Sequence, residues 1–168
     1  CFAEQSWQVA TAARTEQELD AMQVHWETHF PQSKLLTCAA DVSKVEGCQQ
    51  LARQLEEAQW AVDVVVNNVA AFAPGTLLEG PDDQLMQFLQ ANLLSAHYFT
   101  RACLPLLRQS RQAHLFTIGS VSVMDWPVYM AAYTLSKDVL HAWHKGVRLE
   151  LMDTKITTTL IVPGATYT

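Results

Sequence analysis

Short apolar runs of strand length alternate along this chain with longer segments of helical period. The runs are rich in β-branched and aliphatic residues, which favour strands, and they are Gln8–Ala13, Lys34–Ala39, Val62–Val66, His114–Ile118 and Ile156–Val162. Polar residues do not alternate regularly within them, so we expect these strands to be buried on both faces, as in a parallel sheet.

The segments between the runs predict four helices. Thr15 and Ser43 each begin an S/T-x-x-E sequence, the form of a helix-starting capping box. Asp82 or Asp83 can cap a third helix, within which Pro105 should cause a kink or a break. Apolar residues at three- and four-residue steps mark a fourth helix. The helices are expected at about 16–29, 44–59, 82–109 and 129–152.

This alternation predicts an α/β fold, a doubly wound parallel sheet in three α/β/α layers, formed by residues 1–168 as one domain. Ligands of such sheets bind at the carboxyl ends of the strands. Polar or turn-forming residues follow all five predicted strands: Arg14, Asp41, Asn67 with Asn68, Ser120, and Pro163 with Gly164. We expect these strand ends to meet at one crevice.

The composition narrows the function classes. A formal charge of −6 argues against nucleic acid or an acidic membrane surface as the partner, and no apolar run is long enough to span a membrane. A small-molecule ligand fits better. Three of the four cysteines lie in apolar stretches without paired spacing, as expected of core residues in a cytoplasmic protein.

Tyr133 and Lys137 form a Y-x-x-x-K sequence that places both side chains on one face of the fourth helix. An ammonium group beside a phenol favours the phenolate, which lowers the tyrosine pKa from about 10 and makes it a usable general acid or base. Alone, the pair could equally be a surface pair on an ordinary helix.

Ser120 and Asn92 add to this pair. Ser120 follows a predicted strand, thirteen residues before Tyr133, where its hydroxyl could hydrogen-bond a reacting oxygen. Asn92 is a poor helix former inside the third helix, so its amide either serves a partner or is merely structural or solvent-facing.

Together these residues resemble the short-chain dehydrogenase/reductase family over nearly the whole chain. The pattern is closest to the 3-oxoacyl-carrier-protein reductase and sepiapterin reductase members. Five features carry the resemblance in the family's order: Asn67-Asn68-Val69-Ala70, Asn92, Ser120, Tyr133-x-x-x-Lys137 and Pro163-Gly164-x-x-x-Thr168.

The resemblance implies a Rossmann fold and a role for each residue of a catalytic tetrad. Tyr133 would transfer the proton, Ser120 would orient the carbonyl, and Lys137 would lower the tyrosine pKa and hold the nicotinamide ribose. Asn92 would position a water that relays protons to Lys137. The implied cofactor-binding residues also include Asn67, Val69, Ala70, Pro163, Gly164, Thr166 and Thr168.

The end of the first strand bears on the choice of cofactor. Dinucleotide folds often place an acidic residue there for the ribose 2′-hydroxyl, but this chain has Ala13 followed by Arg14. A guanidinium suits a 2′-phosphate, so we expect NADP(H) over NAD(H), unless Arg14 only caps the strand. Asp41 and Val42 resemble the family's adenine-contacting pair.

The sequence departs from the family in two ways. Residues 1–168 contain neither the glycine-rich phosphate loop nor the C-terminal segment of the family, and we expect both in the intact protein. Val69-Ala70 replaces Ala-Gly, which should crowd the cofactor mildly.

Other features have more ordinary interpretations. His25 and His29, like His141 and His144, fit a solvated helix face better than a zinc site, so no metal is expected. Met124, Trp126 and Val128 either wall a substrate pocket or pack in the core.

The sequence therefore predicts a cytoplasmic NADP(H)-dependent reductase acting on a small carbonyl or alcohol. By the resemblance it forms a homodimer or homotetramer through its third and fourth helices, with Leu104, Leu107, Trp143 and Val147 available for contacts. One alternative is an inactive nucleotide-binding regulatory or scaffold member of the same fold. A Rossmann-like methyltransferase is a weaker one, because it gives Tyr133 and Lys137 no role.

Overall fold

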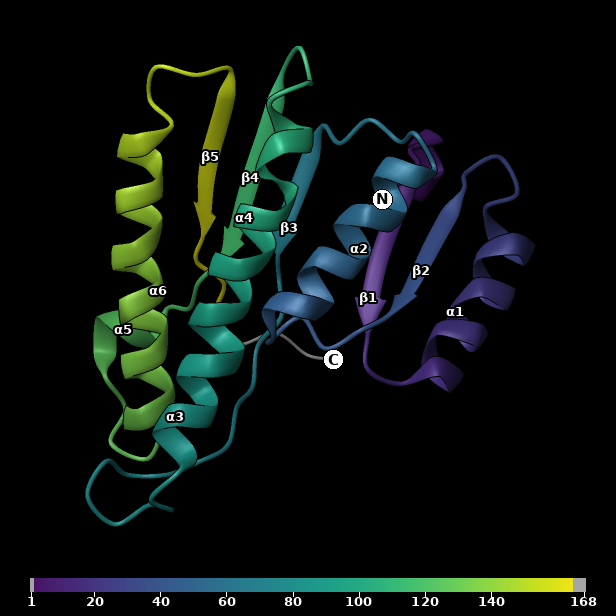
Figure 1. The fold of residues 1–168 in the computed structure, drawn as a ribbon. Helices are drawn as coiled ribbons and strands as arrows, with labels where there is room; N and C mark the ends of the chain where they lie inside the picture. Colours follow the sequence, from purple (N-terminus) through teal and green to yellow (C-terminus); the bar gives the residue numbers. More distant parts are fainter. Residues whose placement is uncertain (1, 165–168) are drawn as a thin grey trace. The chain divides into compact units, whose positions relative to one another are not determined.

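The computed structural model describes residues 2–164 and divides the chain into two compact units, Cys1–Trp60 and Ala61–Thr168. Each unit is a parallel α/β arrangement and is described by itself below (Figure 1). The expectation of a single domain stays a prediction. Within the described residues, no helix combines the length and the apolar character needed to cross a membrane.

The first unit contains a two-stranded parallel sheet. Its elements are η1 (Ala3–Gln5, a 3₁₀ turn), β1 (Val9–Ala13), α1 (Glu16–His29), β2 (Leu35–Ala39) and α2 (Val45–Glu57). β1 and β2 pair in register from Val9 opposite Leu35 to Ala13 opposite Ala39. The next amide along, of Ala40, donates to the backbone oxygen of Ala13 at 2.9 Å, so both strands end at the same edge of the sheet.

The second unit contains a three-stranded parallel sheet in the order β3-β4-β5. Its elements are β3 (Val64–Asn67), α3 (Gln84–Phe88), η2 (Leu89–Leu94, a π-helical turn), α4 (Ser95–Leu107), β4 (Ala113–Ile118), α5 (Ser122–Asp125), α6 (Ala131–Glu150) and β5 (Ile156–Ile161). The register pairs Asn67 with Thr117 and Ile118 with Ile161, so the carboxyl ends of all three strands lie at one edge.

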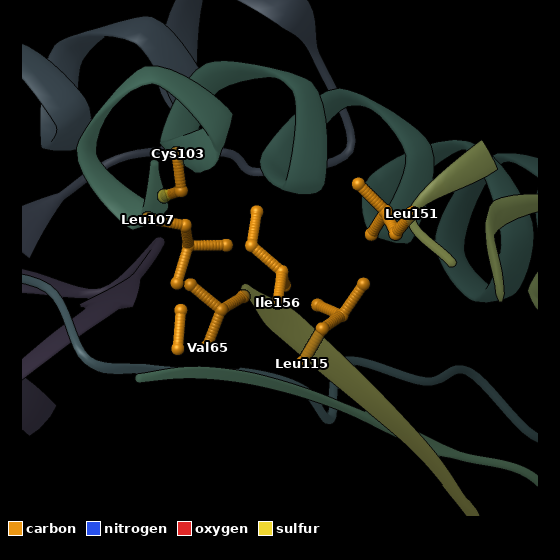
Figure 2. Packing of buried hydrophobic residues seen from close by; sticks show 7 residues of the cluster. Val65, Cys103, Leu107, Leu115, Leu151 and Ile156 are labelled. Carbon is orange, nitrogen blue, oxygen red and sulfur yellow. The ribbon is translucent and has the colours of Figure 1, made fainter. Parts of the chain in front are cut away.

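The core of the second unit lies between one face of this sheet and the helices α4 and α6. Figure 2 shows Val65, Leu115 and Ile156 from the three strands packed with side chains from the helical layer. The remaining members of the cluster are Cys103, Leu107, Ala113 and Leu151. These contacts hold one face of the sheet against α4 and α6.

The five predicted strands all form, and their pairing is parallel as expected. Burial on both faces is wrong for part of the second sheet, since Val66 is 40% exposed. Its neighbour Val65 points into the core beneath α4, whereas the face that carries Val66 receives no packed helix from the described residues of its own unit.

The predicted helices also form, but their starts are not capped as expected. Thr15 is the N-cap of α1 without a side-chain cap hydrogen bond, and Lys44 takes the N-cap position of α2. Ser43 instead donates its hydroxyl to the carboxylate of Asp41 at 2.6 Å. The Asp41 side chain competes for the hydroxyl that a capping box would need.

The third predicted helix contains an interruption that the sequence pattern did not predict. It is divided into α3, the π turn η2 and α4, with Asn92 inside the π turn. Pro105 is accommodated within α4, two residues before the helix ends at Leu107. The π turn widens the helix where Asn92 bonds to a neighbouring loop, as described below.

Of the four expected oligomer contacts, the one at Leu107 is wrong. Leu107 is 1% exposed and belongs to the core, and Leu104 and Val147 pack against that core. These side chains are used within the unit because they lie on the inner faces of α4 and α6. The apolar residues that α6 does expose include Val139 and Leu149.

Candidate active site

The candidate site lies at the carboxyl ends of β3, β4 and β5. Backbone hydrogen bonds continue past the last paired residues, from the Gly119 amide to the Ile161 oxygen at 2.8 Å and from the Val121 amide to the Pro163 oxygen at 3.0 Å. The turn that carries Ser120 is therefore held beside the Pro163-Gly164 segment, as the sequence predicted for two of the five strand ends.

Lys137 is buried and reaches from α6 to the end of β4. It is 2% exposed, and its Nζ donates to the backbone oxygen of Ile118 at 2.9 Å. The same Nζ lies 5.9 Å from the centre of the Tyr133 ring. Burial lowers the pKa of Lys137 to about 8, because removing an ammonium from water disfavours its charged form.

Tyr133 is half-buried on the first turn of α6, one turn before Lys137. Phe72 meets its ring in a T-shaped contact with centroids 5.1 Å apart, and Phe88 does the same at 6.3 Å. Edge-to-face contacts of this kind orient an aromatic ring. The ring of Tyr133 is thus held by two aromatic neighbours while its lysine partner lies beneath it.

Ser120 is buried at the turn after β4, where its backbone and its hydroxyl are both engaged. Its hydroxyl donates to Ser122 Oγ at 2.9 Å and accepts from the Ser122 amide at 3.2 Å. Its amide donates to Nε2 of His141 at 3.3 Å. These contacts give the hydroxyl a defined orientation before any substrate binds.

The side chain of Asn92 holds a loop and does not face solvent. Its Oδ1 accepts from the Ala71 amide at 2.6 Å, and its Nδ2 donates to the Ala71 oxygen at 3.1 Å and to Ser136 Oγ at 2.8 Å. Ser136 in turn donates to the backbone oxygen of Tyr133 at 2.6 Å. Asn92 therefore ties the loop after β3 to the helix that carries Tyr133 and Lys137. Of the alternatives left open by the sequence, solvent exposure is wrong.

Three of the predicted cofactor-binding residues lie at the end of β3 and in the loop after it. Asn67 is buried at the end of the strand and donates to Thr100 Oγ1 at 2.8 Å, while its Oδ1 is buried without a hydrogen-bond partner among the described residues. Val69 and Ala70 are exposed. A buried acceptor next to exposed residues leaves hydrogen-bonding capacity for a ligand at this edge.

The predicted cofactor residues at the end of β5 are only partly described. Pro163 is half-buried and Gly164 is exposed beside the Ser120 turn. Thr166 and Thr168 lie outside the described residues.

In the first unit, Arg14 and Asp41 follow β1 and β2 at the shared edge of the sheet. Arg14 is exposed and Asp41 is half-buried. Hydrogen bonds from Ser43 lower the pKa of Asp41, and the charges of Lys44 and Arg14 contribute in the same direction. Val42 is half-buried and its oxygen accepts from the thiol of Cys48. The structure thus brings Arg14 and Asp41 near each other, as the sequence predicted.

The interpretation of His141 and His144 as a solvated helix face is wrong. They are 8% and 4% exposed, and they contact Ser120 and Thr117 respectively. His141 and His144 lie four and seven residues after Lys137, so the three side chains share the face of α6 that meets β4. His25 and His29, in contrast, are exposed as expected. Among residues 2–164, no group of three or more His, Cys, Asp or Glu side chains is placed to hold a metal ion.

Sequence reasoning missed two side chains at the site. His141 follows Lys137 by one helical turn, so the spacing that revealed the Tyr133 and Lys137 pair also indicated the position of His141. Phe72 has no such signal, because the loop path that brings it to Tyr133 depends on Asn92 and Ala71.

Three apolar side chains between Ser120 and Tyr133 do not pack in the core. Met124 is 69% exposed, Val128 77% and Trp126 40%, so the core-packing alternative is wrong. Trp126 also adopts a left-handed backbone conformation with φ of 46°, which is costly for a bulky residue. Met124, Trp126 and Val128 thus form an exposed apolar segment that follows the Ser120 turn.

Comparison with known proteins identifies the family. The profile of the short chain dehydrogenases matches residues 1–168. The chain belongs to the short-chain dehydrogenase/reductase family. An uncharacterized oxidoreductase of Mycobacterium tuberculosis (strain CDC 1551 / Oshkosh) is 32% identical over 168 residues, which is 99% of this chain and 63% of that protein. The chain thus spans less than two thirds of the length of this relative.

Solved structures of short-chain dehydrogenase/reductase proteins show the same fold. An alcohol dehydrogenase from the archaeon Thermococcus sibiricus, complexed with 5-hydroxy-NADP, matches 99% of this chain and 69% of its own length, with a TM-score of 0.91 and 21% identity. A family protein from Burkholderia phymatum in complex with NAD has a TM-score of 0.89 at 21% identity, covering 96% of this chain and 58% of its own. The fold is therefore Rossmann-like, as the sequence predicted.

Proposed function

We propose that this protein is an NADP(H)-dependent oxidoreductase that interconverts a carbonyl and an alcohol, with Tyr133 as general acid or base. The observation that carries the proposal is the position of Lys137. Its buried ammonium group donates a hydrogen bond to the backbone oxygen of Ile118, close to Ser120, and lies 5.9 Å from the centre of the Tyr133 ring. A buried lysine with a lowered pKa beside another ionisable side chain is typical of a functional site.

The residues present fit a nicotinamide cofactor. Asn67 has a buried acceptor without a partner among the described residues, next to the exposed residues 68–70 at the strand ends. Lys137 supplies a cation at the same edge. A bound nicotinamide supplies or accepts the hydride, and the protein aligns the reactants and moves the proton.

Each polar side chain then has a stated task. In reduction, Tyr133 donates its hydroxyl proton to the carbonyl oxygen as that oxygen gains charge, and Ser120 turns its hydroxyl proton from Ser122 to the same oxygen. Lys137 supplies positive charge beneath the phenolate that Tyr133 becomes. Asn92 acts by holding residue 71 and the start of α6 in place, since its amide bonds to Ala71 and Ser136. Oxidation reverses these steps.

We also propose NADP(H) as the preferred cofactor, with NAD(H) as the alternative. Support comes from Arg14, which is exposed at the end of β1 where a 2′-phosphate would need a cation. The structural neighbours do not decide the preference, because one is complexed with an NADP derivative and another with NAD.

The exposed apolar side chains suggest the character of the substrate. Met124, Trp126 and Val128 follow Ser120, and Phe72 is 55% exposed while touching Tyr133. The amide of Gly75 donates to the Tyr129 oxygen at 2.7 Å, which joins the loop of Phe72 to the segment of Trp126. We propose that these side chains wall the substrate site, which suits a carbonyl compound with an apolar or aromatic part.

The family resemblance further implies a homodimer or homotetramer built on α4 and α6. On α6, the half-buried Trp143 stays available to such a contact, and Val139 and Leu149 are exposed. Light scattering of the purified protein tests this directly, and a monomer would overturn it.

The function is tested by following NADPH and NADH oxidation with three carbonyl probes: acetophenone, acetoacetyl-CoA and sepiapterin. We expect turnover with NADPH on at least one of them. Cofactor binding without turnover on any probe would contradict the proposal and favour the inactive nucleotide-binding alternative.

A further inference from the structure

Three side chains of α6 hold the end of β4. Lys137 bonds to the Ile118 oxygen, His141 to the Ser120 amide, and Nδ1 of His144 lies 3.1 Å from Thr117 Oγ1. These residues recur at helical spacing on one face. The strand end that presents Ser120 is therefore positioned by the same helix that presents Tyr133.

The bond between His141 and Ser120 defines a protonation state. An amide can only donate, so Nε2 of His141 must accept, and the ring proton must lie on Nδ1. The imidazole must also be neutral. Gly119 permits this approach, because a β-carbon at that position would overlap Nε2.

The backbone bond bears on the hydroxyl of Ser120. The amides on either side are bonded to β5 and the residues after it, Gly119 to Ile161 and Val121 to Pro163, and the amide between them bonds to His141. This bond fixes the peptide plane from which residue 120 continues, whereas the bonds between Ser120 and Ser122 involve the Ser120 hydroxyl. His141 is the side chain that bonds the Ser120 amide. Loss of this bond would move the hydroxyl that is meant to contact the reacting oxygen.

Resting on the function proposed above, we propose that His141 is a positioning residue for the reaction: as a neutral imidazole it holds the Ser120 amide and thereby aims the Ser120 hydroxyl. His141 does not touch the reacting atoms itself. Its effect should appear in turnover and not in cofactor binding.

The charges around His141 favour this neutral form. Burial lowers its pKa below 6.5, the nearby Asp138 opposes that shift, and Lys137 and Lys145 reinforce it. His144 is the other titratable neighbour on α6. Among the described elements packed against α6, α3, η2 and β5 carry no titratable side chain, α5 carries only Asp125, and β4 carries His114. The helix α4 carries His97, Tyr98, Arg101 and Cys103, of which His97 bonds to Trp143 of α6.

Protonation of His141 therefore removes the acceptor and should release Ser120. The positioning is present above the lowered pKa and is lost as the pH falls through it. In reduction Tyr133 acts in its protonated form, so lowering the pH does not remove the proton donor. A fall in the reduction rate at acid pH would therefore point to protonation of His141.

The kinetic test compares the wild type with His141→Gln and with His144→Gln, a matched change of the neighbouring buried histidine. NADPH-dependent reduction of the active carbonyl probe is measured from about pH 4.5 to 8, with correction for acid decay of NADPH. We expect His141→Gln to lower kcat about 3- to 10-fold at pH 7, the loss expected from one neutral hydrogen bond, with the KM for NADPH unchanged. It should also abolish the acid-side fall in kcat, which His144→Gln should retain.

An acid-side fall that persists in His141→Gln would overturn the proposal, as would an unchanged kcat. The second readout needs neither turnover nor a variant. In wild-type protein, the amide resonance of Ser120 should shift with the same apparent pKa as the His141 imidazole, and an amide indifferent to that titration would overturn the positioning role.

The two proposals fail separately. Absence of wild-type turnover on all three probes overturns the reductase and, with it, the catalytic consequence of His141. Turnover together with an unresponsive Ser120 amide overturns only the role of His141.

Discussion

The side-chain amide of Asn92 bonds both backbone polar atoms of Ala71, with Oδ1 accepting from the amide at 2.6 Å and Nδ2 donating to the oxygen at 3.1 Å. An asparagine paired with a peptide group in this way replaces the partner that a neighbouring strand would provide. The π turn at residues 89–94 is where this pairing occurs, in keeping with the frequent location of π turns at functional sites.

Asn92→Leu should therefore destabilise the fold strongly. The change removes three hydrogen bonds and leaves the buried Ser136 hydroxyl and the Ala71 peptide without their side-chain partner. We expect a loss of about 2–4 kcal/mol in the free energy of unfolding, measured by urea denaturation. Asn68→Ala, which changes an exposed asparagine of the same loop, should cost less than about 0.5 kcal/mol. Equal losses for the two variants would contradict the account.

Gly119 and Gly146 provide a matched pair of alanine substitutions. A β-carbon at Gly119 meets the His141 ring, whereas at Gly146 it meets open space on α6. We expect Gly119→Ala to destabilise the protein by about 1–3 kcal/mol through this overlap. Gly146→Ala should stabilise it by about 0.4–1 kcal/mol, since it restricts the unfolded chain and favours the helix. Urea denaturation gives both values. A Gly119→Ala variant that is as stable as the wild type, or more stable, would be inconsistent with the packing of His141 against Gly119.

The buried ammonium group of Lys137 should lower the free energy of unfolding at neutral pH. Its folded-state pKa of about 8 lies below its ordinary value of 10.5, so folding disfavours the charged form. The stability contribution of this group is therefore greatest above pH 10.5, declines as the pH falls toward 8, and stays low at pH 7. Lys137→Met should then be more stable than the wild type at pH 7, by about 1–3 kcal/mol, despite losing its bond to Ile118.

The pH dependence checks this explanation. The advantage of Lys137→Met should shrink as the pH rises from 8 toward 10, as measured by chemical denaturation at each pH. A variant that is less stable than the wild type at pH 7 would show that the hydrogen bond to Ile118 outweighs the desolvation of the ammonium group.

Arg14→Ala should weaken binding of NADPH and leave that of NADH unchanged. A charge-assisted bond between a guanidinium and a phosphate is worth about 1.5–3 kcal/mol, which corresponds to a rise of about 10- to 100-fold in the Kd for NADPH. Arg53→Ala, at an exposed arginine on α2, serves as the control. Titration calorimetry measures both cofactors, and equal weakening of NADPH and NADH by Arg14→Ala would refute a 2′-phosphate contact.

Much of this architecture could be predicted from the sequence, because it depends on local patterns. Strand positions follow from apolar runs such as 114–118, and the pair of Tyr133 and Lys137 follows from helical spacing. The π turn at Asn92 and the contact of Phe72 with Tyr133 could not be predicted in this way. Both depend on a loop whose course is set by hydrogen bonds between residues far apart in the chain.

The buried histidines were misjudged for a related reason. A polar residue on a helix is usually solvated, and its burial becomes favourable only when a partner is present. The partners of His141 and His144 are the Ser120 amide and the Thr117 hydroxyl, which lie at the end of β4 and in the turn after it. Only the packing of α6 over that strand reveals them.

The hydroxyl of Tyr133 is central to the proposed chemistry, and its removal tests the account most directly. The measurement is the kcat of NADPH-dependent reduction for the wild type, Tyr133→Phe and Tyr98→Phe, the last removing a tyrosine hydroxyl from α4. We expect Tyr133→Phe to retain the fold and NADPH binding but to lose at least about 100-fold in kcat, while Tyr98→Phe keeps the wild-type rate. A Tyr133→Phe variant that turns over within a few-fold of the wild type would contradict this expectation.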